Sequence, residues 1–142
     1  MQKIITALDK LKKEDTPKWG KMNASQMLHH CNLFIDLYNN KIEVPWMMKI
    51  FARIFSPIFI KYVLSKDYTQ APKNLNTFSK IKVNDLSINF EEEKIKLANQ
   101  LKEVDKLEGK VSHPLYGKIE TKLMKDLIKH HTSHHFHQFN IM

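Results

Sequence analysis

The chain has 142 residues, which is enough for one domain with a proper core and too few for two comfortable ones. A hydrophobic content of 42% and a charged content of 27% are typical of a soluble globular protein, and three glycines with five prolines argue against a turn-rich β architecture. The single cysteine, Cys31, excludes an intramolecular disulfide. We therefore predict one all-α domain over residues 1–142.

A formal net charge of +8 would allow binding to nucleic acid, to anionic lipid or to an anionic small molecule. The lysines, however, are scattered over every predicted helix and neither form a tract nor alternate with aromatic residues. The charge therefore favours a solvated basic surface, and no nucleic-acid partner is expected.

The first predicted helix covers residues 1–11 and carries its apolar residues on one side, at Ile4, Ile5, Leu8 and Leu11. It has no hydrophobic stretch of signal-peptide length, so we expect a cytoplasmic protein. A turn with Pro17 and Gly20 follows, and Trp19 within it is expected to pack at the start of the second helix.

The second predicted helix opens with a capping-box pattern, Asn23 followed by Gln26, and runs to about Asn39. Its helical wheel places His30 and Cys31 on the apolar face and turns His29 away from it. A nucleophilic Cys31 activated by His30 is the alternative to a buried thiol. Neighbours in a helix diverge by about 100°, so the buried thiol is favoured.

Residues 46–65 are the strongest candidate for a membrane segment, because they approach spanning length. They contain three cationic residues, Lys49, Arg53 and Lys61, and a central Pro57. We predict two short helices packed on the other helices, or an amphipathic lid on the surface, and no membrane span.

Residues 66–89 form a long connection, which in a compact domain is usually functional or packed against something, and we expect it to cover one end of a pocket. The third major helix then begins near Asn89 and ends at Gly109, with Leu97, Leu101 and Val104 on its apolar face. The HPLYG sequence that follows is predicted to be a turn shaped by His113, which is not expected to bind metal.

The last predicted helix ends in the histidine-rich sequence HHTSHHFHQFN. Its helical wheel places His131 and His135 in the middle of the apolar stripe. The other histidines point to the opposite, polar side: His130, His134 and His137. The helix thus separates an inward pair from an outward set.

His30, His131 and His135 therefore form a candidate metal site. Side chains at positions i and i+4 lie one helical turn apart, and a ligand from a facing helix would complete three-nitrogen coordination with positions left open. The alternative is that these histidines only form hydrogen bonds in the core, or that the tract is a frayed polar helix end. Burial of three unpaired imidazoles is costly, which favours ligation, and nitrogen ligands suit zinc, nickel, copper or iron.

Three sequence blocks occur in this order along the chain: WGKMNASQMLHHC, HPLYGK and HTSHHFHQFN. Together they resemble the pattern of an uncharacterised branch of the DinB-like superfamily, whose members include YfiT-type and mycothiol-dependent proteins. The resemblance covers nearly the whole chain apart from residues 42–87.

This resemblance implies an antiparallel four-helix bundle with up-down-down-up connectivity, a short helical insertion between its second and third helices, and often a homodimer. It also implies a divalent metal, zinc or nickel first, held by His30, His131 and His135, the residues that the helical wheels select. Two positions depart from the family pattern. Glu120 replaces a Ser or Thr cap, and Asn140 replaces a glycine in a left-handed position that Asn tolerates.

The leading hypothesis is a metal-dependent enzyme that acts on a small electrophilic substrate. The resemblance implies that it is of the thiol S-transferase type, with a low-molecular-weight thiol as partner. No carboxylate stands in an obvious general-base motif, so a hydrolase is less well supported. The alternative is a non-catalytic helical bundle with a structural or sensing metal, and the third choice is a nucleic-acid-binding protein.

Overall fold

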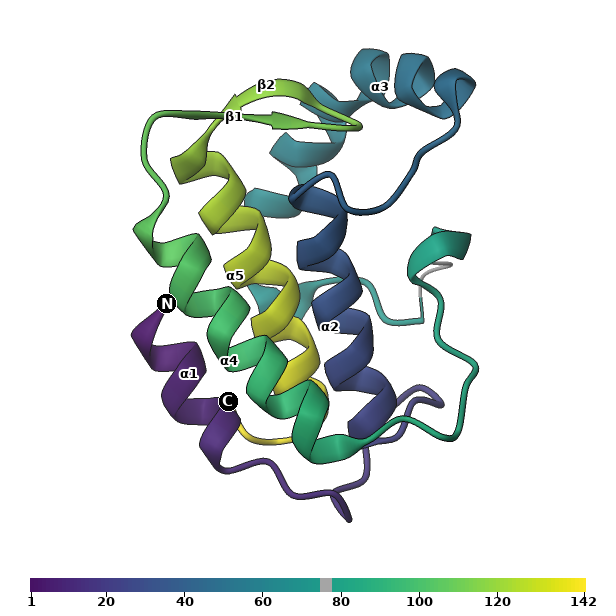
Figure 1. Cartoon of the computed structure of the whole chain (residues 1–142), viewed down its shortest axis with the longest axis vertical. Coiled ribbons are helices and arrows are strands. Elements are labelled where there is room, and N and C mark those ends of the chain that lie inside the picture. Colours follow the sequence, from purple (N-terminus) through teal and green to yellow (C-terminus); the bar gives the residue numbers. More distant parts are fainter. Residues whose placement is uncertain (75–77) are drawn as a thin grey trace.

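The computed structural model describes residues 1–74 and 78–142. Within them the protein is mostly helical, with five α-helices and a small two-stranded sheet (Figure 1). The helices are α1 (Gln2–Asp9), α2 (Ala24–Tyr38), α3 (Trp46–Leu64), α4 (Phe90–Lys106) and α5 (Thr121–Gln138). Two short 3-10 helices, Tyr68–Gln70 and Ser79–Ile81, lie between α3 and α4. The helical class is confirmed, but the chain is not purely α.

Helices α1, α2, α4 and α5 lie side by side in Figure 1 and meet in one hydrophobic core. Its most deeply buried residues come from all four of them and include Leu8, Met27, Leu28, Leu97, Leu101, Val104, Ile128 and Phe136. Burying one such side chain stabilises the fold by about 1.5–3 kcal/mol. The core therefore holds α2 and α5 in a fixed relation, and these two helices carry the candidate site.

Side-chain caps define where α2 and α4 begin. The predicted capping box is confirmed, because Asn23 Oδ1 accepts from the backbone N–H of Gln26 at 2.9 Å and Gln26 Oε1 accepts from that of Asn23 at 3.0 Å. At α4, Asn89 Oδ1 accepts from the N–H groups of Glu91 and Glu92 at 3.0 and 3.3 Å. Each cap satisfies donors that a helix start leaves unpaired.

The predicted turn after α4 is a β-hairpin, which corrects the all-α prediction. Strand β1 (Lys110–His113) pairs antiparallel with β2 (Gly117–Glu120), and His113 lies opposite Gly117. The backbone N–H groups of Leu115 and Tyr116 both donate to His113 Nδ1 at 3.1 Å, so His113 shapes the turn as predicted. Strands of four residues are too short for alternation to reveal them.

The prediction of two short helices over residues 46–65 is wrong, because α3 is one helix that contains Pro57. The proline lacks the N–H that would bond to the preceding turn, yet the helix continues on both sides of it. Only Ser56 of α3 is buried, and many of its large apolar side chains are exposed. No helix among the described residues combines the length and apolar character that crossing a membrane requires.

Candidate metal centre

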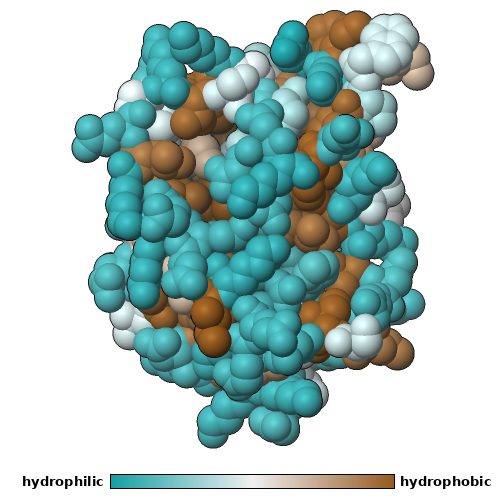
Figure 2. Space-filling model, in the orientation of Figure 1, coloured by the Kyte–Doolittle hydropathy of each residue, from teal (hydrophilic) through white to brown (hydrophobic). Residues whose placement is uncertain are grey.

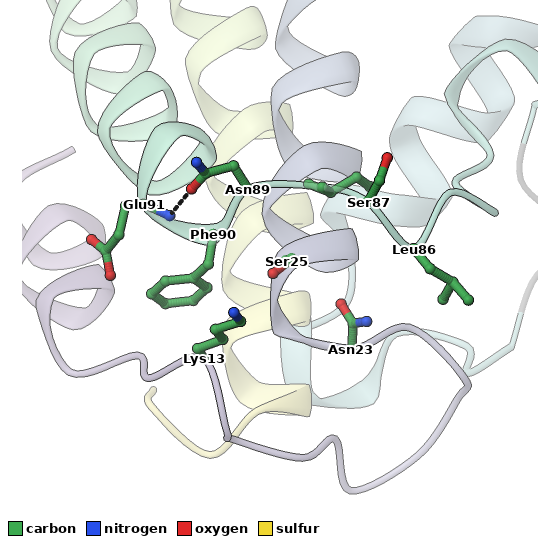
Figure 3. A pocket seen from close by; sticks show the side chains of 9 residues that line it. Lys13, Asn23, Ser25, Leu86, Ser87, Asn89, Phe90 and Glu91 are labelled. Carbon is green, nitrogen blue, oxygen red and sulfur yellow. Dashed lines mark hydrogen bonds between the residues drawn. The ribbon is translucent and has the colours of Figure 1, made fainter.

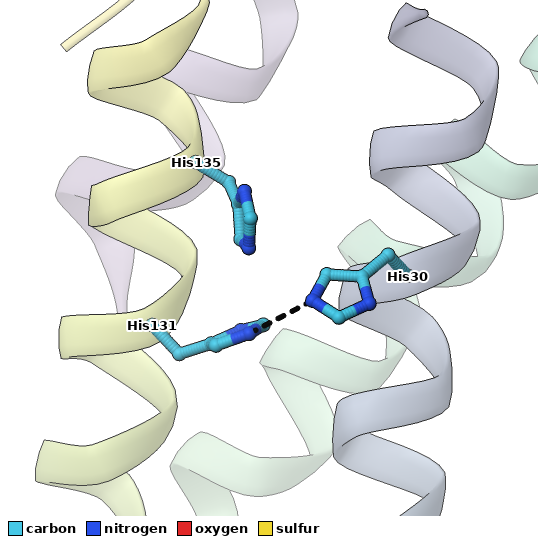
Figure 4. Close-up of side chains that lie close together, drawn as sticks. All are labelled: His30, His131 and His135. Atoms are coloured by element: carbon cyan, nitrogen blue, oxygen red, sulfur yellow. Dashed lines mark hydrogen bonds between the residues drawn. The ribbon is translucent and has the colours of Figure 1, made fainter. Parts of the chain in front are cut away.

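Three histidine side chains from two helices meet between α2 and α5. His30 projects from α2, His131 and His135 lie one turn apart on α5, and their rings turn toward one another (Figure 4). One ligand nitrogen from each lies within 4.8 Å of the other two, and the Nε2 atoms of His30 and His131 are 3.1 Å apart. The structure thus brings together the three residues that the helical wheels selected.

A backbone carbonyl sets the tautomer of His30. The Nδ1 atom of His30 lies 2.8 Å from the carbonyl oxygen of Ile81. A carbonyl oxygen can only accept, so Nδ1 carries the hydrogen and Nε2 presents a lone pair. A hydrogen bond of this kind orients a metal-binding histidine and fixes which nitrogen is free.

A side-chain amide sets the tautomer of His135. The Nε2 group of Gln138 donates to the carbonyl oxygen of Trp19, which leaves Gln138 Oε1 facing His135 Nδ1 at 2.8 Å. The Nδ1 atom of His135 must therefore carry the hydrogen, and Nε2 is left with its lone pair. Gly20 makes room for this amide, because a Cβ atom there would stand 2.7 Å from Gln138 Nε2.

His131 closes the cluster from below the other two rings in Figure 4 and is covered by an aromatic ring. The His131 imidazole stacks on Phe34 with ring centroids 3.7 Å apart and an interplanar angle of 7°. Its Nδ1 atom is buried and has no hydrogen-bond partner among the described residues. Phe34 therefore supplies an apolar wall that keeps water from this side of the cluster.

Burial keeps the three imidazoles neutral. It lowers the pKa of His30, lowers that of His131 well below its ordinary value, and lowers that of His135 to about 3. Mutual repulsion of the rings acts in the same direction for His131 and His135. Neutral imidazoles are the form that binds a metal, so no proton has to leave near neutral pH.

The chemistry of this donor set fits a divalent cation. Tetrahedral coordination with metal–nitrogen distances of about 2.0–2.1 Å places ligand nitrogens about 3.3–3.4 Å apart, and the Nε2 atoms of His30 and His131 are separated by 3.1 Å. His30 and His135 both offer lone pairs, while His131 Nε2 can donate only one hydrogen. A cation would satisfy all three nitrogens, which hydrogen bonds within the cluster cannot do.

The remaining α5 histidines lie outside the cluster, as predicted, but other segments of the chain contact them. His130 Nε2 lies 3.1 Å from the carbonyl oxygen of Lys66, and His134 Nδ1 lies 3.1 Å from that of Tyr68. The ring of His137 packs on Trp19 at 5.5 Å between centroids. The connection after α3 covers this face of α5, which confirms for its described residues that it packs against the helices.

Trp19 and Cys31 are packing residues. Trp19 packs on His134 and His137 of α5. Cys31 is fully buried, and burial raises the pKa of its thiol, so it is a core residue as predicted and no nucleophile. His29 points away from the cluster and pairs with Glu93 at 2.9 Å.

A surface pocket lies away from the histidines, between the first turns of α2 and α4 (Figure 3). Its polar lining includes Asn23 and Asn89, whose side-chain oxygens already cap the two helices. Lys13 is the cation among its lining residues, and the carboxylate of Glu91 in the same lining opposes an anion. The three clustered histidines remain the stronger candidate for chemistry.

The fold and the site define a mostly helical protein in which three clustered histidines can hold a metal ion. The chain belongs to the family described as "Protein of unknown function (DUF1569)", which matches it over residues 1–142. Comparison with curated proteins and with solved structures gives no match.

Three further contributors to the site escaped the sequence analysis. Gln138 carried a signal, because it lies on the same stripe as His135 and one turn after it. Phe34 lies on the apolar face of α2, but its stacking on His131 depends on how the two helices meet. Ile81 acts through its backbone carbonyl, for which the sequence holds no signal.

Proposed function

We propose that the protein binds one divalent cation, zinc or nickel first, through His30, His131 and His135. The observation that carries this proposal is the convergence of three neutral imidazoles, two of which are held by Ile81 and Gln138 with the Nε2 lone pair free. Imidazole ligands without thiolate suit these ions. Three protein ligands leave a coordination position open, which is typical of catalytic sites.

We further propose that the chain is a DinB-like protein whose helices α1, α2, α4 and α5 form an up-down-down-up bundle, with α3 as the insertion. The order of the three sequence blocks supports this assignment, as does the pairing of one histidine from α2 with two from α5. Members of that superfamily often form homodimers, and the same state is proposed here.

The activity proposed is transfer of a small thiol to a small electrophilic substrate. A divalent cation held by His30, His131 and His135 would lower the pKa of a bound thiol or water and so would supply a nucleophile near neutral pH. The protein's own residues orient the ligands through Ile81 and Gln138 and exclude water through Phe34. The buried Cys31 cannot supply the thiol, which must come from a separate small molecule.

Metal content of the untagged protein tests the proposal. We expect about one ion per chain in the wild type and a loss of most of it in His135→Ala, because two imidazoles hold a divalent ion far less tightly than three. The control is His134→Ala, which removes a histidine next in sequence whose ring bonds to Tyr68 instead. Elemental analysis of all three, with circular dichroism to verify folding, gives the answer. Equal metal in His135→Ala and wild type would contradict the site.

Gln138→Leu is expected to weaken zinc affinity by about 10–100-fold without removing a ligand, as loss of an outer-shell partner does. The substitution deletes the acceptor that orients His135 Nδ1 and the donor to the Trp19 carbonyl. Competition with a chromogenic zinc chelator measures the change. Asn99→Leu, a change of the same kind on α4 away from the site, is the control and is expected to keep wild-type affinity.

A further inference from the structure

Helix α3 exposes an apolar face that nothing in the described structure covers. Most of the large exposed hydrophobic side chains of the protein belong to this helix, with Ile58 at 73%, Trp46 at 70% and Phe51 at 62% exposure. Figure 1 shows α3 beginning at the end of the molecule that carries the hairpin, and Figure 2 shows hydrophobic surface at the same corner. Exposed apolar surface of this extent marks an interaction site.

The orientation of α3 is the reverse of that of an ordinary surface helix. Its small residues Ala52 and Ser56 lie on the side that faces the protein, where they are half-buried and buried. The bulky residues Phe51, Ile54 and Ile58 fall within about 60° of one another on the helix circumference and point outward. Ile60 and Val63 pack against the core, whereas the stripe of Phe51, Ile54 and Ile58 is exposed.

The charges on α3 are all of one sign. The helix carries Lys49, Arg53 and Lys61 and contains no aspartate or glutamate. Lys61 borders the outward apolar arc, about 20° beyond Ile54 on the helix circumference. A lysine in that place can extend its ammonium group past an apolar layer toward negative charge.

We propose that α3 is an interfacial helix that binds the surface of an anionic lipid membrane, lying in its plane without crossing it. A helix of 19 residues is about 28 Å long, and its aromatic residues, from Trp46 to Tyr62, are of the kind that settles at the headgroup level. Anionic headgroups supply the opposite charge for Lys61 at the border of the outward stripe, whereas Lys49 and Arg53 lie on the other side of the helix.

A second copy of the chain fits this face less well. Two α3 helices that met through this stripe about a two-fold axis would bring Lys61 of each copy to the contact, and α3 has no carboxylate to pair with it. Lys61 would then be buried in an apolar contact without a counter-charge, which is costly. The anionic lipid surface is therefore the occupant that the charges favour.

Vesicle co-sedimentation of the full chain tests the proposal. We expect binding to phosphatidylcholine vesicles that contain phosphatidylglycerol to be at least about tenfold stronger than binding to phosphatidylcholine alone, and to weaken as salt is raised. The double variant Phe51→Asp with Ile58→Asp is expected to lose this binding by a similar factor. Both residues are exposed, so the fold should survive.

The matched control is Leu86→Asp with Ile95→Asp, which adds the same two charges at exposed apolar positions outside α3. It is expected to bind vesicles within about twofold of the wild type. An equal loss of vesicle binding in both double variants would overturn the proposal, because the change in net charge alone would then explain the loss. A second result would also overturn the proposal. If sedimentation velocity shows a dimer that dissociates only in the α3 variant, a second copy of the chain covers this face.

Discussion

Replacing Phe136 with alanine is expected to lower the free energy of unfolding by about 3–5 kcal/mol, as is usual for loss of a buried aromatic side chain. Phe136 is 0% exposed and is the largest of the fully buried side chains. Its removal leaves a cavity in the core between α5 and its neighbours that surrounding side chains fill only in part. The expected loss is a large fraction of the stability of a domain of this size.

Urea denaturation followed by circular dichroism measures the change, with the difference taken from the midpoint and slope of each curve. Phe59→Ala is the control, because it makes the same chemical change at a residue of α3 that is 51% exposed, where no cavity forms. We expect Phe59→Ala to stay within about 0.5 kcal/mol of the wild type. Similar losses in the two variants would mean that Phe136 is not a core residue.

The positions of the three clustered histidines could be predicted because each depends on one helix alone. A helical wheel converts sequence spacing into direction, and His30, His131 and His135 each fall on the stripe that their helix buries. Because apolar stripes of neighbouring helices meet in a core, the sides of α2 and α5 that carry these histidines then face each other. The same reasoning placed the capping box of Asn23 and Gln26, which is local in sequence.

The environment of the site could not be predicted, because it depends on segments distant in sequence. The Ile81 carbonyl reaches His30 across 51 positions, and the Lys66 carbonyl meets His130 across 64. A helical wheel describes one helix alone, so it cannot show that the connection after α3 covers the second face of α5. The partners of the outward histidines could not be predicted for this reason.

The form of α3 escaped prediction for a different physical reason. Pro57 was read as a helix break, yet one missing hydrogen bond does not end a helix whose other residues favour it. The sequence left open whether this segment packs on the other helices or lies on the surface as an amphipathic lid. The exposure of this stripe shows the limit of a hydrophobic pattern. The pattern predicts a surface suited to contact but does not identify the partner of that contact.

Acid is expected to destabilise the protein through His113, by about 3 kcal/mol between pH 6.5 and 4 as an order of magnitude. Burial lowers the pKa of His113 to about 4, because its ring lies between Tyr38 and Tyr116 with centroids 4.1 and 4.3 Å away. A proton on Nδ1 would also displace the N–H groups of Leu115 and Tyr116, which donate to that atom.

The direction of the change in stability with pH depends on which state, folded or unfolded, binds more protons. The unfolded chain takes up a proton near pH 6.5, an ordinary histidine value, and the folded protein only near pH 4. Between these values the unfolded state holds more protons, so stability rises with pH. The contribution of His113 to the free energy of unfolding is complete above about pH 6.5. It is lost as the pH falls toward 4 and changes no further below that.

Urea denaturation at several pH values, in wild type and His113→Asn, isolates this contribution. Asparagine does not titrate in this range, and its side-chain oxygen can accept from the same turn N–H groups. Carboxylates and the clustered histidines titrate alike in both proteins, so their effects cancel in the difference. We expect the wild type to lose more stability than the variant between pH 6.5 and 4. Parallel pH profiles would show that His113 takes up its proton in the folded hairpin without cost, which a ring enclosed by Tyr38 and Tyr116 should not do.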